Sequence, residues 1–183
     1  MKNDKQIAVF GIYDSVRAAD KGVATLKNSG FKADDISALL PEGDQTREFA
    51  HENSTKAPEG ATTGGATGAV LGGTLGWLAG IGSLAIPGVG PLIAAGPIMA
   101  ALAGMGVGTA IGAVSGALIG MGIPEYEAKR YEGRVKDGGV LVSVHCTTTA
   151  KRDEAKKLLE ASGATDISSS SESSADSRPA AGM

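Results

Sequence analysis

Few side chains in this sequence could form a metal site or a nucleophilic site. The chain has two histidines, His51 and His145, and one cysteine, Cys146. These three residues cannot form a closed zinc site without added carboxylates. His145 and Cys146 are neighbours in a predicted strand, so their side chains point to opposite faces and cannot bind one ion together. We therefore predict that His145 is a half-exposed strand residue and that Cys146 is a small buried apolar residue, like Val144 on the same face.

Some glycines in the middle of the chain resemble fragments of phosphate-binding loops. Examples are residues 88–90 (Gly-Val-Gly) and 104–106 (Gly-Met-Gly). A phosphate loop follows a strand, opens a helix and needs a matching acidic residue or lysine, but no lysine occurs between Lys56 and Lys129. No nucleophile and base stand in an arrangement that indicates catalysis. The sequence therefore predicts no enzyme activity, no catalytic residue, no cofactor, no metal and no small-molecule substrate.

The overall charge and the cysteine content limit the remaining function classes. The formal net charge is −3 and no cluster of Arg and Lys alternates with aromatic residues, so we expect no binding of nucleic acid. A single cysteine excludes an internal disulfide and fits a reducing compartment. The apolar run near the N-terminus is too short for a secretory signal. We expect the first segment to fold in the cytoplasm.

The strongest pattern is glycine at every fourth position within an uncharged block, residues 60–124. A spacing of four places these glycines on one face of each of two helices, where another helix backbone can approach closely. The predicted helix-packing interface consists of Gly64, Gly68, Gly72, Gly76, Gly80, Gly104, Gly108, Gly112, Gly116 and Gly120.

This glycine content favours a membrane over water. Ten glycines inside helices cost about 10 kcal/mol relative to alanine, whereas in hydrocarbon only the helix satisfies every backbone polar group. Residues 64–86 and 98–123 are each long enough to cross a hydrocarbon core of about 30 Å. The predicted turn between them consists of Pro87, Gly88, Gly90 and Pro91. We predict a transmembrane hairpin, with a soluble oligomer that buries the hairpin between subunits as the alternative.

Basic residues on both sides of the uncharged block set the expected orientation. Positive charge favours the cytoplasmic side of a membrane, and the predicted turn carries no charge. The basic residues are Arg47 and Lys56 before the block and Lys129, Arg130, Arg134 and Lys136 after it. We therefore expect a protein of the inner membrane with both termini in the cytoplasm.

The two charged flanks share one order of elements. Leu-Lys-Asn-Ser-Gly at 26–30 and Asp-Ile-Ser at 35–37 correspond to Leu-Glu-Ala-Ser-Gly at 159–163 and Asp-Ile-Ser at 166–168. The first flank predicts a strand at 6–13, a helix from Asp14 or Ser15 to Gly30 and a strand at 35–40. The second predicts a helix from Pro124 to Gly138, a strand at 139–146, a helix from Thr149 to Gly163 and a strand at 165–168.

A strand–helix–strand unit written twice predicts an α+β fold. We expect a ferredoxin-like split β-α-β sandwich, with residues 6–13 and 139–146 as a parallel central pair, interrupted by the glycine-zipper hairpin. The predicted divisions are the first half of the sandwich at 1–41, a polar linker at 42–63, the hairpin at 64–123, the second half at 124–168 and a disordered tail at 169–183.

Several ordered motifs give the chain a resemblance to a known family. They are Val-Phe-Gly-Ile-Tyr-Asp-Ser at 9–15, Ile-Pro-Gly-Val-Gly-Pro at 86–91, Ala-Ala-Gly-Pro at 94–97, Gly-Ile-Pro-Glu at 122–125 and Gly-Gly-Val-Leu-Val-Ser-Val at 138–144. As a set, these motifs resemble the bacterial general stress protein family, also called the heat-induced stress protein domain, over about residues 5–168. The resemblance implies a bacterial stress-associated protein with no catalytic residues to carry over.

The layout also resembles a small membrane subunit of the quinol-oxidising alternative complex III. In that subunit a split β-α-β sandwich is interrupted by two membrane helices. The resemblance implies a scaffold without a redox centre, although the glycine zipper departs from the bulkier helices usual there.

The leading hypothesis from the sequence is a non-enzymatic, stress-associated membrane protein. Its glycine-zipper hairpin would mediate oligomerisation or packing with partner membrane helices in the lipid bilayer, and its cytoplasmic sandwich would sense or recruit a partner. The alternatives are a scaffold subunit of a larger respiratory-type membrane complex, and a soluble oligomer with the hairpin buried between subunits. A pore is less favoured, because the predicted spans contain no polar ring.

Overall fold

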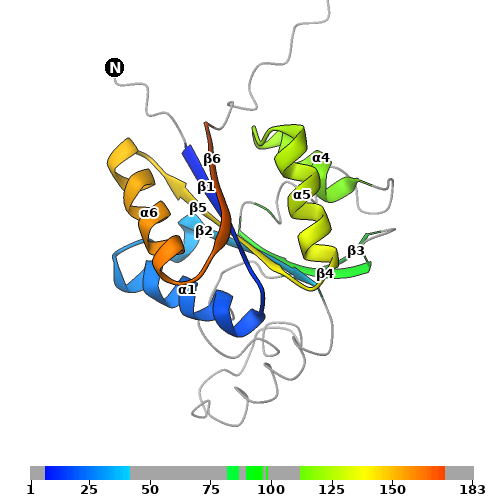
Figure 1. Cartoon of the computed structure of the whole chain (residues 1–183), viewed down its shortest axis with the longest axis horizontal. Coiled ribbons are helices and arrows are strands. Elements are labelled where there is room, and N and C mark those ends of the chain that lie inside the picture. The colour runs from blue at the N-terminus through cyan, green and yellow to red at the C-terminus, as the bar shows by residue number, and fades with distance from the viewer. Residues whose placement is uncertain (1–6, 42–81, 87–89, 97, 99–111, 172–183) are drawn as a thin grey trace, which may run out of the picture.

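The computed structural model describes residues 7–41, 82–86, 90–96, 98 and 112–171 (Figure 1). Within these residues, six strands form one sheet in the order β3-β4-β2-β5-β1-β6. The strands are β1 (Ile7–Tyr13), β2 (Ile36–Pro41), β3 (Gly82–Ile86), β4 (Gly90–Ala95), β5 (Val140–Cys146) and β6 (Thr165–Ser171). Helices and strands together give the mixed α+β class that the sequence predicts.

Two β-α-β units interleave in the centre of this sheet. β1 and β2 belong to the first unit and β5 lies between them, while β5 and β6 belong to the second unit and β1 lies between them. Every neighbouring pair is antiparallel, including β1 with β5. The prediction of a parallel central pair was therefore wrong. Each unit leaves a gap of one strand, and the strand that fills the gap belongs to the other unit and runs the opposite way.

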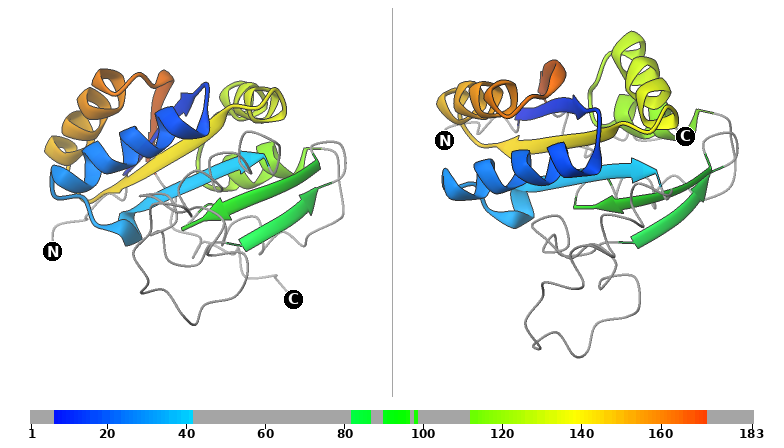
Figure 2. Two further views of the ribbon diagram at one scale, coloured as in Figure 1. Left: turned by 90° about the horizontal axis from the view of Figure 1, so that it is seen from below. Right: turned by 60° about the horizontal axis from the view of Figure 1, so that its bottom comes forward.

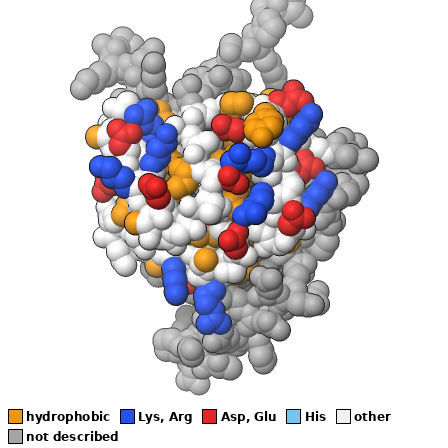
Figure 3. Space-filling model, viewed as in Figure 1, with side chains coloured by type: hydrophobic (Ala, Val, Ile, Leu, Met, Phe, Trp, Pro, Cys, Tyr) orange, Lys and Arg blue, Asp and Glu red, His pale blue; other side chains and the backbone are white. Residues whose placement is uncertain are grey.

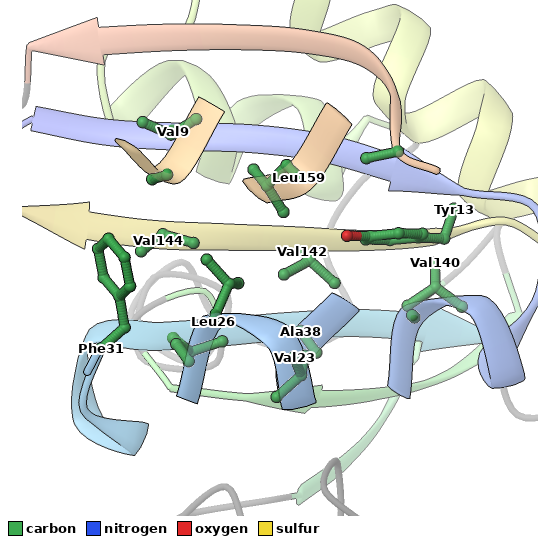
Figure 4. Packing of buried hydrophobic residues seen from close by; sticks show 14 of the residues in the cluster. Val9, Tyr13, Val23, Leu26, Phe31, Ala38, Val140, Val142, Val144 and Leu159 are labelled. Atoms are coloured by element: carbon green, nitrogen blue, oxygen red, sulfur yellow. The ribbon is translucent and has the colours of Figure 1, made fainter. Parts of the chain in front are cut away.

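Helices cover both faces of the sheet (Figures 1 and 2). The helices are α1 (Val16–Asn28), α4 (Ala113–Gly120), α5 (Glu125–Lys136) and α6 (Thr149–Ala161), and one 3-10 turn, η1 (Ala33–Asp35), precedes β2. The first core lies between the sheet and α1 with α6, and includes Val9, Leu26 and Val142 (Figure 4). The second core lies under α4 and α5 on the other face, and includes Phe10, Leu118 and Tyr131.

Local capping signals fix the ends of the two sandwich helices. The Ser15 hydroxyl accepts a hydrogen bond from the backbone N–H of Ala18 (3.2 Å), and the Thr148 hydroxyl accepts one from Lys151 (3.2 Å). Thr148 is thus the N-cap of α6, one residue before the predicted Thr149. Gly30 and Gly163 follow the helices at φ +90° and +96°, a conformation that favours glycine.

Part of the uncharged block forms strands where the sequence predicted the end of a helix, at residues 82–86, and part of a turn, at residues 90–91. Residues 82–86 form β3 instead of the end of a first helix, and β4 pairs with β2 so that Leu39 lies opposite Ala94. Leu92 and Ala94 are both fully buried in the second core. The edge of β2 supplies backbone hydrogen-bond partners and an apolar surface for β4. These contacts come from a distant segment, so the local sequence pattern does not reveal them.

A continuous second helix over residues 98–123 was also a wrong prediction. Gly112 has φ +95°, so a helix cannot run through it, and α4 covers only Ala113–Gly120. Gly122 has φ +89° and ends the segment. In the described residues, no helix combines the length and the apolar character that crossing a membrane requires.

The C-terminal strand is longer than predicted. Residues 169–171 belong to β6, although the serine-rich composition predicted disorder from Ser169 onward. Val9, Ala8 and Ile7 of β1 lie opposite Ser169, Ser170 and Ser171. The backbone of β1 therefore orders a segment whose sequence contains no apolar side chain to bury. The predicted linker at 42–63 and the rest of the predicted tail lie outside the described residues.

Candidate functional site

Most of the predicted helix-packing glycines lie outside the described residues. These are Gly64, Gly68, Gly72, Gly76, Gly80, Gly104 and Gly108. Gly116 and Gly120 lie in α4, where Gly116 is half-buried and Gly120 is exposed, while Val114 and Leu118 are buried against the sheet. The two α4 glycines thus occupy the side of the helix turned away from the sheet. The helix-packing interface stays a prediction.

The residues of the predicted hairpin turn divide in the same way. Pro87 and Gly88 lie outside the described residues, whereas Gly90 and Pro91 are the first two residues of β4. Gly90 lies opposite Ile86 of β3. These two residues therefore begin a strand.

Among the described residues, a well-defined polar site lies between α4 and α5. Glu132 of α5 is only 6% exposed. Its carboxylate Oε2 accepts a hydrogen bond from the backbone N–H of Ser115 in the first turn of α4 (3.0 Å), and Lys136 Nζ lies 3.3 Å from Oε1. Gly112, the residue at the N-cap position of α4, has no side chain to cap the helix. Glu132 therefore supplies the cap from a different helix, and its charge also suits the positive end of the α4 dipole.

The electrostatics of Glu132 favour its charged form. Burial of the carboxyl acts to raise its pKa, but the hydrogen bonds from Ser115 and the nearby Lys136 ammonium outweigh burial, so the pKa lies below its ordinary value. The Ser115 hydroxyl in turn donates to the carbonyl oxygen of Gly112 (3.0 Å). Glu132 and Ser115 thus fix the position of the first turn of α4, within the uncharged block.

Two neighbouring residues of α5 fix the edge strand β6. The Tyr131 hydroxyl donates to the carbonyl oxygen of Asp166 (2.6 Å) and accepts from the Ser168 hydroxyl (2.8 Å). Burial of the Tyr131 ring raises the pKa of its hydroxyl, and the Ser168 hydrogen bond opposes that shift. Arg130 forms an ion pair with the Asp166 carboxylate. α5 therefore positions β6 through both main-chain and side-chain contacts.

The basic residues after the uncharged block are all paired in the structure. Arg134 NH2 lies 2.6 Å from the Asp14 carboxylate at the turn between β1 and α1, and Lys129 Nζ lies 2.6 Å from Glu125. Together with Arg130 and Lys136, they give four basic residues in four ion pairs. In the sequence these residues appear only as a positive flank, and their partners are not evident there. Only the Glu125–Lys129 and Glu132–Lys136 pairs carry a sequence signal, the spacing of four in a helix.

Two large apolar side chains are exposed on the same α4–α5 layer. Ile119 in α4 is 42% exposed and Tyr126 in α5 is 76% exposed. Figure 3 shows an apolar area bordered by charged side chains on this side of the molecule. The exposed apolar surface adjoins the end of the uncharged block.

The described residues offer little for catalysis. Cys146 is buried in the first core, as predicted, and burial raises the pKa of its thiol to about 11, which makes it a poor nucleophile near neutral pH. His145 is half-buried on the opposite face of β5, also as predicted. Among the residues that the structure describes, no group of three His, Cys, Asp or Glu side chains is placed to hold a metal ion.

Comparison with known proteins finds a matching family. The family model described as alternative complex III, ActD subunit, matches residues 7–169. No curated protein and no solved structure matches the chain significantly. Of the two resemblances seen in the sequence, the match supports the complex III subunit and gives no support to the general stress protein family.

Proposed function

The chain belongs to the ActD subunit family of alternative complex III, and we propose that it is a non-catalytic subunit that holds a glycine-rich segment in place for assembly with other subunits. The polar residues described above connect helices and strands to one another. Among the described residues, no group of side chains is arranged for catalysis. The family assignment supports a role within a multi-subunit complex.

The observation that carries this proposal is the position of α5. The described parts of the uncharged block belong to the fold as β3 and β4 at the edge of the sheet and as α4, and α5 follows α4 directly. α5 fixes α4 through Glu132, β6 through Tyr131 and Arg130, and the β1–α1 turn through Arg134. A segment attached through this helix has a defined position relative to the sandwich, which a scaffold subunit requires.

We also propose that the part of the uncharged block before β3 associates with a membrane, with the flanks on its cytoplasmic side. The support is the absence of charge over residues 60–81, together with the exposed apolar side chains of Ile119 near the end of the block and Tyr126 just after it. The glycine spacing over residues 64–80 supports close contact with partner helices. Carbonate extraction of native membranes, with chemical labelling of Lys56 and Lys129 from each side, tests the placement.

Affinity purification of the tagged full-length chain from native membranes tests the scaffold role. We expect cytochromes and other subunits to co-purify in a defined ratio. Replacing Gly68, Gly72 and Gly76 with leucine is expected to release these partners, because bulky side chains keep a partner helix at a distance.

The matched control is Gly133→Ala. Gly133 lies in α5, and an added Cβ there meets no atom within 4 Å, so the control should keep the complex. Circular dichroism checks that each variant folds. The proposal fails if the wild-type chain purifies without partners, or if the leucine variant keeps the same partners as the control.

A further inference from the structure

The edge strand β6 has an unused outer side in the described structure. β6 ends the sheet, and in the described part of the chain no strand pairs with its outer side (Figures 1 and 4). An exposed edge presents unpaired backbone N–H and C=O groups that can accept another strand.

The first β-α-β unit contains a strand that corresponds to β6 and that pairs with another strand on its outer side. Residues 35–37 and 166–168 share the sequence Asp-Ile-Ser, so β2 and β6 are corresponding strands of the two β-α-β units. On its outer side β2 pairs antiparallel with β4, from Ala38 to Pro41. The equivalent positions in β6 begin at Ser169. The fold therefore accommodates an antiparallel strand at this position without changing the unit.

β6 contains one irregularity near its start, but the residues after it lack the charges and prolines that commonly protect sheet edges. Proteins block edges with lysines, prolines or bulges, and residues 167–171 contain no charged residue and no proline. Asp166, with φ +53°, lies next to the irregularity in the β1–β6 pairing and is bound by Arg130, so its charge is taken up at one end of the strand. The remaining residues, from Ile167 to Ser171, form the open part of the edge.

Side-chain hydrogen bonds to neighbouring elements hold the open part of β6 in place. The Ser168 hydroxyl bonds to Tyr131, and the Ser170 hydroxyl donates to the carbonyl oxygen of Gly122. Since an already ordered strand loses little further entropy on pairing, this edge is prepared for binding.

We propose that β6 pairs antiparallel with β6 of a second copy of this chain, with the two-fold axis at Ser169. This register places Ser169 opposite itself, Ser168 opposite Ser170 and Ile167 opposite Ser171. All of these pairs are uncharged, so this register places no like charges opposite each other between residues 167 and 171, and a strand paired with itself gives the symmetric contact of a two-fold interface. The pairing joins two six-stranded sheets into one. The proposal is independent of the glycine-rich segment and of the role in complex III.

A charge-pairing experiment on the full-length chain tests this two-fold arrangement. The chain is studied by sedimentation velocity over a range of concentrations, in mild detergent if needed for solubility. We expect a reversible dimer for the wild type. Ser169→Lys and Ser169→Glu, each alone, place like charges opposite each other, and we expect each to raise the dimer dissociation constant about fivefold. Equal amounts of the two variants together should recover dimer, because lysine then faces glutamate.

The control pair is Asn28→Lys and Asn28→Glu, at an exposed position at the end of α1, which should leave association unchanged. The proposal is overturned if the wild type sediments as a monomer at every concentration. It is also overturned if the Ser169 variants associate as the wild type does, or if their mixture recovers no dimer. Since a folding defect from Ser169→Lys or Ser169→Glu would not be repaired by mixing, recovery distinguishes pairing from misfolding.

Discussion

Replacing Glu132 with alanine is expected to detach the start of α4 from α5. The buried carboxylate is the acceptor of the Ser115 backbone N–H (3.0 Å). With alanine at this position, that N–H stays buried and loses its partner, and the Lys136 ammonium loses its counter-charge. α4 then keeps its apolar contacts but not the fixed orientation of its first turn.

The size of the effect follows from the kind of contact that is lost. A hydrogen bond to a charged group contributes about 1.5–3 kcal/mol, and an unpaired buried donor is costly in itself. We therefore expect Glu132→Ala to lower the free energy of unfolding by about 2–3 kcal/mol. Glu132→Gln keeps an oxygen that can accept from Ser115 but loses the charge, so we expect a loss of about 1 kcal/mol.

The pH dependence gives a second, independent measurement. The pKa of Glu132 is lower in the folded protein than in the unfolded chain, so its stabilising effect is fully present above the ordinary glutamate pKa of about 4.3. This contribution disappears as the pH falls through the lowered folded value, because the protonated carboxyl no longer favours the folded state. The difference in stability between the wild type and Glu132→Gln should therefore shrink below about pH 4.

Urea unfolding monitored by circular dichroism measures the stability, and hydrogen exchange at the Ser115 amide measures the local contact. Glu125→Gln is the matched control, because Glu125 pairs with Lys129 at the same spacing on the same helix but is 67% exposed. We expect this control to have a much smaller effect than Glu132→Gln. If the Glu125 and Glu132 variants lose equal stability, or if Ser115 exchange does not accelerate in Glu132→Ala, the capping role is wrong.

Three further predictions concern the rest of the fold. Gly22→Ala places a Cβ 2.0 Å from the hydroxyl of the fully buried Tyr13, so despite the better helix propensity we expect a loss of about 1–3 kcal/mol in urea unfolding; a gain in stability would contradict this packing. Tyr131→Phe removes the hydrogen bond to the carbonyl of Asp166 and should cost about 1 kcal/mol, with faster amide exchange along β6 but not along α1. Cys146 should react with a thiol reagent at pH 8 only after unfolding, because burial raises its pKa to about 11, and rapid labelling of the native protein would refute that burial.

The sequence was a good guide to the two β-α-β units. Alternating apolar residues in β1 and β5, the capping hydroxyl of Ser15 and the glycine after each helix are short-range signals, and the observed elements begin and end within a few residues of the predicted positions. The same kind of local pattern failed for residues 82–86, which were predicted as helix, and for Gly90 and Pro91, which were predicted as a turn. There, apolar residues and glycines fit a helix as well as a strand, and the strand forms because β2 offers an edge.

The candidate site was the least predictable part. Glu132 and Lys136 are visible as a helical pair in the sequence, but Ser115, the third member, lies 17 residues away in the chain. Arg134 and Asp14, 120 residues apart, meet only because the fold brings α5 next to the residue that follows β1. The packing of α5 on the sheet thus gives these charges partners that their spacing does not reveal.

The amino-acid sequence by itself determined which segments of the two units become strands and helices, because periodicity and capping act over a few neighbouring residues. Only the tertiary structure decided the order and direction of the strands, the second core under α4 and α5, and the pairing of the basic residues of α5. These features depend on contacts between distant segments, where burial and hydrogen bonding are shared by partners that no local pattern identifies.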